Sequence, residues 1–480
     1  MDRNCDRKYL FFIILMSLFV IDAWATDYYV SPTGNDKNTG TSLSRPFATL
    51  AAAINAAKSP GDNVFIEPGR YIVNDTEIMG EAKPYKHVFD FAHNGIEDQP
   101  IRFVGLVDDK GNKPVFDFSN ISPEGFRIAA FHVRVSWISI SNVEVVNLRN
   151  GATGHSQSEN FRLENARHCT LDNIVAHDGM GIGFYICKHS SDNLVVNCDA
   201  YNNYDTVGGS GTPGDGGNND GFGCHVASSA DTGNMFVGCR SWNNTDDGFD
   251  LINCSAPVTI AYCFAAYNGY DSSYKSRGDG NGFKCGGRGM KGRDVKMSEG
   301  GFPMHEIYNN VAYRNKANGI YSNHNLCGIN FHDNTSVANG AYNYNFVNRK
   351  SPAAADNVDV NGYGHIVISN LSHGASEERG CVGWLSADSA NCVISGNSFH
   401  YANGKWSEDC ITGFLSIDYP DMTEPRTPSG HYSNRTLRFL QIADKAYGSD
   451  FSGYAAAVAY AKHNHGAKAG ESTNVPAIGK

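Results

Sequence analysis

The stretch Cys239-Arg-Ser-Trp-Asn-Asn-Thr-Asp-Asp-Gly-Phe249 contains two short phrases whose repetition along the chain decides the fold. The first phrase is usually a polar residue or cysteine, any residue, a small residue, and then an apolar or aromatic residue. Most of its copies begin about 25 residues apart, and the two longest steps contain glycine-rich insertions at 208–217 and 278–301. The copies are Asn142-Val-Glu-Val, Asn173-Ile-Val-Ala, Cys198-Asp-Ala-Tyr, Cys239-Arg-Ser-Trp, Phe264-Ala-Ala-Tyr, Asn310-Val-Ala-Tyr and Asn334-Thr-Ser-Val, with weaker copies at Asn370 and Asn397.

The second phrase is a glycine followed by a large apolar residue, about 10 to 12 residues after the first phrase where nothing is inserted. Two or three short strands in each repeat, joined by turns rich in asparagine and glycine, predict a parallel β-solenoid. A β-sandwich or a propeller would show antiparallel strands or a period near ~40 residues. We therefore predict an all-β chain folded as a right-handed parallel β-helix, with rungs ~4.8 Å apart. The second phrase then forms one inward apolar column: Phe184, Phe222, Phe249, Phe283, Ile320 and, in a variant Asn-Phe copy, Phe346.

The ends of a solenoid expose unpaired backbone groups and therefore need caps. Pro46 is followed by the alanine-rich stretch 47–58, which has the pattern of a short N-terminal capping helix over the first rung. Residues 454–462 have a similar composition and predict a second helix. Because no linker divides the chain, we expect residues 26–480 to form a single β-helix domain. Separately, we expect the protein to be a monomer.

The first 25 residues have the composition of an export signal. Arg3, Arg7 and Lys8 precede the apolar run 9–20, and Ala23-Trp24-Ala25 supplies small residues at a cleavage position. This pattern predicts a secretory signal peptide over residues 1–25. The apolar run is too short to cross a bilayer, which takes ~20 residues, and no later stretch is apolar enough. We therefore expect a secreted protein without a membrane span.

Composition narrows the class of protein further. The 480 residues carry 39 Lys and Arg against 50 Asp and Glu, a net charge of −11, and an acidic chain of this kind repels nucleic acid. Hydrophobic residues make up 41% of the chain and aromatic residues 11%, which excludes a disordered protein. The cysteines lack zinc-finger spacing, and their pairing is left open.

Rungs in register bring acidic residues of different repeats together. The residue after each inward phenylalanine points outward, which aligns Gly223, Asp250 and Lys284. The residues two positions before the phenylalanines form a second aligned column. The two columns contain three carboxylates, and a fourth directly precedes the second column's Asp247. Four carboxylates are therefore predicted on two adjacent rungs, with Lys284 one rung further: Asp220, Asp246, Asp247 and Asp250.

Four neighbouring carboxylates repel one another. Two unit charges about 4 Å apart cost ~4 kcal/mol at an effective dielectric constant near ~20. Oxygen ligands of this kind suit Ca²⁺ better than zinc or copper, and the spacing is not that of an EF-hand loop, so the fold would assemble the site. The alternative is that each aspartate only caps a turn. The alignment of four acids beside a lysine favours a metal site.

Lys284 is flanked by glycines in Asn281-Gly-Phe-Lys-Cys-Gly-Gly-Arg288, which leave room for a large ligand. A surface lysine is often only a solvated charge. Here, however, residues 275–296 carry seven basic residues against two acidic ones, and a positive patch in an acidic chain suits a polyanionic ligand. Arg288 is a candidate for binding a substrate carboxylate, with a structural salt bridge as the alternative. Asn323 and His324 are candidates for contacting sugar, with a turn as the alternative.

With these motifs in this order, the chain resembles polysaccharide lyase family nine, whose known members degrade pectin. The resemblance implies that the four aspartates bind calcium and that Lys284 is the catalytic base. Cys285 after the lysine and the insertion 286–303 depart from the family pattern. The motifs that carry the resemblance are His177-Asp-Gly, Asn219-Asn-Asp-Gly-Phe222, Trp242-Asn-Asn-Thr-Asp-Asp-Gly-Phe-Asp-Leu251, Asn281-Gly-Phe-Lys-Cys-Gly-Gly287, Asn339-Gly-Ala-Tyr-Asn-Tyr-Asn-Phe346, Tyr29-Val-Ser-Pro-Thr-Gly-Asn-Asp36 and Pro46-Phe-Ala-Thr-Leu50.

The implied reaction is a β-elimination at a galacturonate unit of pectin. Calcium on the substrate carboxylate would withdraw charge, a neutral Lys284 would take the C5 proton, and the C4–O bond would break to leave a 4,5-unsaturated sugar. Because an ordinary lysine has a pKa near ~10.4, we expect the cation and Arg288 to lower the pKa of Lys284 and activity to rise toward alkaline pH.

Other functions fit part of the same pattern. A glycoside hydrolase would use Asp246, Asp247 and Asp250 as acid and base on water, an epimerase could share the fold, and a non-enzymatic carbohydrate-binding protein would use the metal site without turnover. Polygalacturonate and the alternating rhamnogalacturonan I backbone remain open as substrates.

Overall fold

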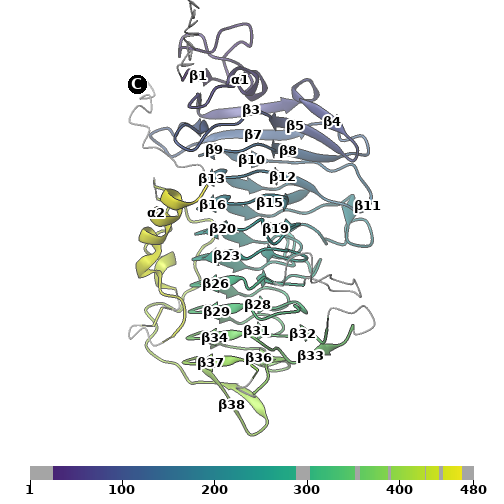
Figure 1. Cartoon of the computed structure of the whole chain (residues 1–480), viewed down its shortest axis with the longest axis vertical. Coiled ribbons are helices and arrows are strands. Elements are labelled where there is room, and N and C mark those ends of the chain that lie inside the picture. Colours follow the sequence, from purple (N-terminus) through teal and green to yellow (C-terminus); the bar gives the residue numbers. More distant parts are fainter. Residues whose placement is uncertain are drawn as a thin grey trace, which may run out of the picture.

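The computed structural model describes residues 25–287, 303–351, 357–387, 391–427, 429–439, 441–442 and 447–466. The predicted signal segment up to residue 24, Arg288 and the insertion as far as residue 302 lie outside the described residues. The described chain is a long coil of stacked rungs, with the N-terminal strands at one end and the C-terminal rungs at the other (Figure 1).

Three long sheets run along the coil, and successive rungs contribute one strand to each sheet. In pairing order, sheet 1 consists of β1 (Asp27–Val30), β2 (Asn63–Ile66), β6 (Ile101–Gly105), β9 (Ile138–Ser141), β13 (Thr170–Asp172), β16 (Leu194–Val196), β20 (Asn234–Val237), β23 (Val258–Ala261), β26 (Glu306–Tyr308), β29 (Asn330–His332), β34 (Ile366–Ile368) and β37 (Val393–Ser395). Sheet 2 consists of β3 (Gly69–Asn74), β7 (Pro114–Asn120), β10 (Glu144–Val146), β14 (Val175–His177), β17 (Asp199–Tyr201), β21 (Arg240–Trp242), β24 (Phe264–Ala266), β27 (Val311–Tyr313), β30 (Thr335–Val337) and β35 (Leu371–His373).

Sheet 3 carries the second phrase of the repeat. Its strands are β4 (Gly80–Ala82), β5 (Tyr85–Phe91), β8 (Arg127–Val133), β12 (Ser158–Glu164), β15 (Gly181–Lys188), β19 (Phe222–Val226), β22 (Phe249–Asp250), β25 (Phe283–Lys284), β28 (Ile320–Tyr321), β31 (Tyr344–Asn345) and β36 (Val382–Gly383). All pairs in the three sheets are parallel except β4 with β5. The prediction of an all-β parallel helix is confirmed.

In the described part of the chain, three short two-stranded sheets lie outside the three long sheets. They are β11 (Gly154–His155) with β18 (Gly208–Gly209), β32 (Asn348–Arg349) with β33 (Asp359–Val360), and the hairpin β38 (Phe399–Ala402) with β39 (Lys405–Glu408). Three 3₁₀ turns are also described: η1 (Asp75–Glu77), η4 (Thr436–Arg438) and η5 (Phe451–Gly453).

The inward apolar column is confirmed from Phe184 to Ile320 and is wrong at its last member. Phe222 pairs with Phe249, and their rings stack with centroids 4.7 Å apart. Ile320 pairs with Tyr344 rather than with Phe346. Because side chains alternate across a strand, Phe346 also points inward, and it is buried beside Tyr344 rather than above Ile320.

The glycines of the second phrase are required by the close stacking of backbones. A Cβ on Gly248 would lie 2.5 Å from the carbonyl oxygen of Gly282 on the next rung, and one on Gly282 would lie 2.6 Å from that of Gly319. Contacts this short push the rungs apart, so only glycine fits between the turn and the inward phenylalanine.

Buried asparagines stack in the turns and satisfy backbone groups there. In two columns, most amides donate to the next asparagine's oxygen and to a backbone carbonyl, as Asn268 does toward Asn315 and Ser241. Such ladders replace hydrogen bonds that a buried turn would otherwise lack. One column contains Asn203, Asn244, Asn268, Asn315 and Asn339, and the other contains Asn310, Asn334, Asn370 and Asn397.

Two helices accompany the coil. Helix α1 (Leu50–Ala56) is shorter than the predicted stretch 47–58, is capped by Thr49, and buries Leu50, Ala53 and Ile54 against the core at the N-terminal end. Helix α2 (Tyr454–Asn464) packs on the flank beside β16 and β20 (Figure 1) rather than over an end of the coil.

The described residues contain twelve cysteines, ten of them buried, and the structure joins none of these twelve in a disulfide. Among the residues that the structure describes, neither helix is long and apolar enough to cross a membrane.

Candidate active site

The outward column predicted for sheet 3 is confirmed. Gly223 on β19 pairs with Asp250 on β22, which pairs with Lys284 on β25. The next rung places Tyr321 of β28 beside the lysine. Parallel pairing in register thus brings residues from four separate repeats into one line on the outer face of the sheet.

Lys284 contacts three carboxylates. Its Nζ lies 2.9 Å from Oδ2 of Asp247, 3.3 Å from Oδ2 of Asp250 and 3.8 Å from Oδ2 of Asp279. Lys284 is buried although it lies on the outer face, whereas the side chain of Asp279 is 72% exposed. The amine is therefore held in one position, with an exposed carboxylate, that of Asp279, at its outer side.

Three of the four predicted metal ligands converge. One oxygen each of Asp220, Asp246 and Asp247 lies within 4.8 Å of the other two, and all three residues are buried. Backbone N–H groups fix them: Asp247 donates to Asp220 and Asn281 donates to Asp247. Asp250 is not in this trio, but Lys284 bridges it to Asp247.

The pKa values reflect this crowding. Burial, reinforced by the repulsion of neighbouring acids, raises the pKa of Asp220 and of Asp246 well above the usual range. Burial likewise raises the pKa of Asp247 to about 6, although Lys284 acts in the opposite direction. For Lys284 itself, burial lowers the pKa, but the facing carboxylates outweigh burial and raise it well above the usual value.

This direction is opposite to the lowered pKa expected for Lys284. The protein groups that face its Nζ are carboxylates, and Arg288, which was expected to oppose them, lies outside the described residues. The protein's own groups therefore favour the ammonium form of Lys284.

Two further side chains border the site and were missed in the sequence. Nε2 of His225 lies 4.0 Å from Oδ1 of Asp250, and burial lowers the pKa of this histidine. The Tyr321 hydroxyl is 2.9 Å from Nε2 of His324. Both could have been found from the alternation of side chains along a strand. Tyr321 follows the inward Ile320, and His225 is two positions beyond the outward Gly223, so both face outward.

The two residues predicted to contact sugar, Asn323 and His324, differ in their exposure to solvent. Asn323 is buried in a turn with φ of 50°, and its amide donates to the Gly286 carbonyl. His324 is partly exposed, between Tyr321 and Asp359, whose Oδ1 lies 2.6 Å from its Nδ1.

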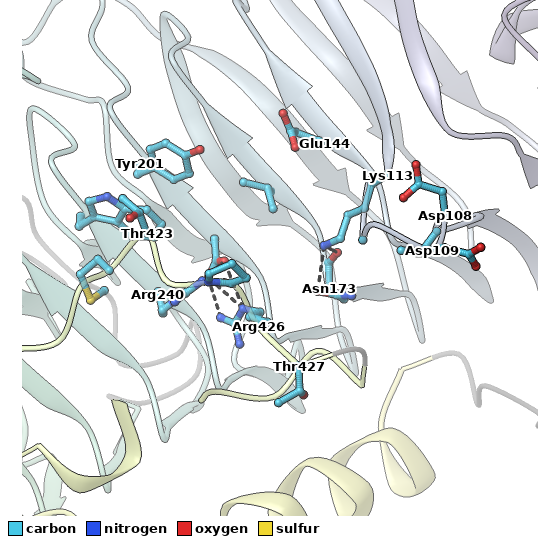
Figure 2. A pocket seen from close by; sticks show the side chains of 17 residues that line it. Asp108, Asp109, Lys113, Glu144, Asn173, Tyr201, Arg240, Thr423, Arg426 and Thr427 are labelled. Carbon is cyan, nitrogen blue, oxygen red and sulfur yellow. Dashed lines mark hydrogen bonds and ion pairs between the residues drawn. The ribbon is translucent and has the colours of Figure 1, made fainter. Parts of the chain in front are cut away.

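Another cavity, of about 390 Å³, lies on sheet 2 beneath the C-terminal segment (Figure 2). Lys113 reaches its wall and donates to Asn173, while Arg240 and Arg426 meet at the buried Asp199. Its lining contains none of the residues predicted for the site.

Comparisons with known proteins identify the family to which the chain belongs. The chain matches the Pel9A-like, right-handed β-helix region over residues 28–361. It is 33% identical over 352 residues to pectate lyase L of Dickeya dadantii (strain 3937), which covers 73% of this chain and 71% of that protein. Among solved structures, it resembles a rhamnogalacturonan lyase with 37% identity and a TM-score of 0.79, over 88% of this chain and all of that one. It also resembles pectate lyase Pel9A with 27% identity and a TM-score of 0.59, over 87% and 89% of the two chains. The chain therefore belongs to the Pel9A-like right-handed β-helix family and is a polysaccharide lyase.

Proposed function

We propose that the protein is a secreted, calcium-dependent lyase that cleaves the galacturonate-containing backbone of pectin by β-elimination, with Lys284 as the Brønsted base. The observation that carries this proposal is the position of Lys284 Nζ, 2.9 Å from Asp247 and 3.3 Å from Asp250 beside the converging trio. Export is supported by the signal pattern of residues 1–25.

The acidic residues fit a hard divalent cation. Asp220, Asp246 and Asp247 converge in a buried place where their charges are unfavourable without a counter-charge. Oxygen-only ligands of this kind suit Ca²⁺, and Asp250 adjoins them through Lys284. When bound, the cation would withdraw charge from the substrate carboxylate and so acidify the neighbouring C5–H.

Lys284 then performs the proton transfer. Its neutral amine takes the C5 proton, the C5–H electron pair forms the C4=C5 double bond, and the C4–O bond breaks with its electrons leaving on the glycosidic oxygen. A base must be unprotonated to act. Because the carboxylates around Nζ raise the pKa of Lys284, the neutral fraction, and with it the rate, should grow as pH rises.

Two polymers are candidate substrates, since polygalacturonate and rhamnogalacturonan I both present galacturonate at the cleaved bond. The similarity to the rhamnogalacturonan lyase structure exceeds that to Pel9A in both identity and TM-score. This difference supports rhamnogalacturonan I as the polymer to test first.

The test uses Lys284→Arg and Lys284→Ala with both polymers, with and without EDTA. Arginine keeps the positive charge among the carboxylates but stays protonated at any working pH, so it cannot act as a base. We expect wild-type protein to form an unsaturated product detected by its ultraviolet absorbance, and both variants to lose this activity while keeping their fold. New reducing ends without a double bond would instead indicate a hydrolase, and binding without either product would indicate a carbohydrate-binding protein.

A further inference from the structure

A cavity of about 640 Å³ opens on sheet 3, the same sheet that carries Lys284. The outward column runs from Lys284 through Asp250 and Gly223 to Tyr185 and Arg162. Arg162 therefore lies four rungs from the lysine, which is ~19 Å at the usual strand spacing. We call this cavity the arginine–tyrosine groove; its walls include Tyr85, Arg127, Arg162, Tyr185, Lys188 and His225.

The groove adjoins the candidate active site through His225. The Tyr185 hydroxyl lies 3.2 Å from Nδ1 of His225, and the other nitrogen of this ring lies 4.0 Å from Asp250. Gly223 separates Tyr185 from Asp250 in the column and adds no side chain above the sheet. A linear polymer bound at Lys284 can thus continue along the sheet into the groove.

Two arginines are held rigidly in the groove. The guanidinium carbons of Arg127 and Arg162 each lie 4.6 Å from the centre of the Tyr85 ring. Both arginines and the Tyr85 hydroxyl bond to the buried carboxylate of Glu159. Arg127 also donates from Nε to the Gln157 carbonyl, and Arg162 donates from Nε to Glu164. Among the described residues, Nη1 of Arg127 and Nη2 of Arg162 therefore have no protein acceptor.

The charge of the groove suits an anion. Its lining contains four basic side chains and one acidic side chain, Glu164, in a protein whose net charge is −11. Buried Glu159 balances one of these positive charges. Arginines fixed in this way are suited to a carboxylate, because the planar guanidinium offers paired N–H donors, while tyrosine rings offer flat apolar surface with a polar edge.

We propose that the arginine–tyrosine groove binds the carboxylate of a second uronate unit of the same polymer, four rungs from the unit at Lys284. This inference rests on the proposed function, because that function supplies the acidic polymer. It assigns Arg127 and Arg162 to substrate binding away from the reacting sugar, so the groove should affect affinity for long chains and leave the chemical step unchanged.

The test uses the polymer that wild-type protein cleaves, rhamnogalacturonan I or polygalacturonate, and a trimer of the same backbone, with Arg127→Gln, Lys188→Gln at the rim, and Arg70→Gln as the matched control. The Arg70 side chain is 53% exposed and pairs with Asp117 on sheet 2, away from the groove. Losing one charged hydrogen bond at a partly exposed site should raise KM for the polymer about five- to tenfold in Arg127→Gln, with kcat nearly unchanged. Lys188→Gln should show a smaller rise in KM. Neither variant should alter the kinetic parameters for the trimer, which is too short to extend ~19 Å from Lys284 to Arg162.

An unchanged polymer KM in both groove variants, or an equal rise for trimer and polymer, would overturn the inference. If wild-type protein forms no unsaturated product from any substrate, the proposed function fails instead. Retardation of wild-type and Arg127→Gln protein in gels containing polygalacturonate then still tests the groove, because binding needs no turnover: weaker retardation of the variant supports it and equal retardation contradicts it. Thermal melting of each variant verifies that the fold is retained.

Discussion

Arg426 and Asp199 are 227 residues apart in the chain and meet in a buried ion pair, in which Nη2 of Arg426 lies 2.6 Å from Oδ1 of Asp199. Arg240 approaches the same carboxylate from β21, at 2.6 Å from Oδ2. The two arginines hold the pKa of Asp199 below its usual range against the effect of burial. This single carboxylate thus ties the C-terminal segment to sheet 2.

Asp199→Asn should therefore destabilise the protein strongly. Removing the carboxylate leaves two buried guanidinium groups without their counter-charge, which costs about 3–5 kcal/mol. The free energy of unfolding in urea measures this loss. Arg379→Gln, which breaks a contact with Glu378 in which both side chains are exposed, is the control and should change stability by less than about 1 kcal/mol. Equal losses of unfolding free energy in the two variants would contradict the role of Asp199 as the counter-charge of Arg240 and Arg426.

His177 should make stability depend on pH. Burial lowers its pKa, but contacts with Asp178 and Glu144 outweigh burial and raise the pKa from 6.5 to about 9. A raised pKa means that the stabilisation is fully present below pH 6.5 and is lost as pH rises through about 9. The free energy of unfolding of wild-type protein, measured in urea at a series of pH values, should exceed that of His177→Gln by as much as about 3 kcal/mol at acidic pH. This difference should shrink at alkaline pH. A difference that grows with pH would rule out this account.

Calcium should stabilise the folded protein through the converging trio. A ligand at about 100 times its Kd adds ~2.7 kcal/mol to the free energy of unfolding, which appears as a higher melting temperature. Asp246→Asn should abolish most of this shift, because Asp246 is one of the three converging residues. Asp279→Asn removes an exposed carboxylate outside the trio and should keep the shift. A calcium shift that survives in Asp246→Asn would place the cation elsewhere.

Gly248→Ala should test the stacking of backbones in sheet 3. The added Cβ would lie 2.5 Å from the Gly282 oxygen and 3.0 Å from the Ala265 Cβ, so the rungs must shift, at a cost of about 1–3 kcal/mol. Gly211→Ala is the control, since its Cβ would meet only a side-chain oxygen of Asp215 at 3.6 Å. Urea unfolding of both variants measures the difference, and equal stabilities would show that the coil adjusts freely.

The fold and the lysine column could be predicted because both follow from periodicity. Once Phe222, Phe249 and Phe283 point inward, the alternation of a strand determines that Asp250 and Lys284 point outward. The same rule placed Phe346 next to Ile320 in the column, a position that Tyr344 occupies in the structure. The error arose because both residues point inward and the Asn-Phe pair resembles the glycine phrase. Periodicity identifies the face of a residue but not the register of a rung whose phrase has changed.

The arginine–tyrosine groove could not be predicted in this way. Tyr85, Arg127 and Arg162 lie on rungs that precede the first copy of the glycine phrase, so no repeated phrase aligns them. The direction of the Lys284 pKa also depended on geometry, since it follows from which charges face Nζ and at what distance. The ion pair of Asp199 with Arg426 joins segments that share no sequence pattern.

In-register pairing also makes the positions of the outward side chains on sheet 3 independent of the length of the segments that connect its strands. Phe222 and Phe249 are 27 residues apart in the chain and Phe283 and Ile320 are 37 residues apart, yet each pair lies on neighbouring strands of sheet 3. Loops between strands can therefore lengthen or diversify without moving the amine relative to its acids. Such a scaffold allows the surroundings of Lys284 to vary in shape while the lysine and its facing carboxylates keep their relative positions.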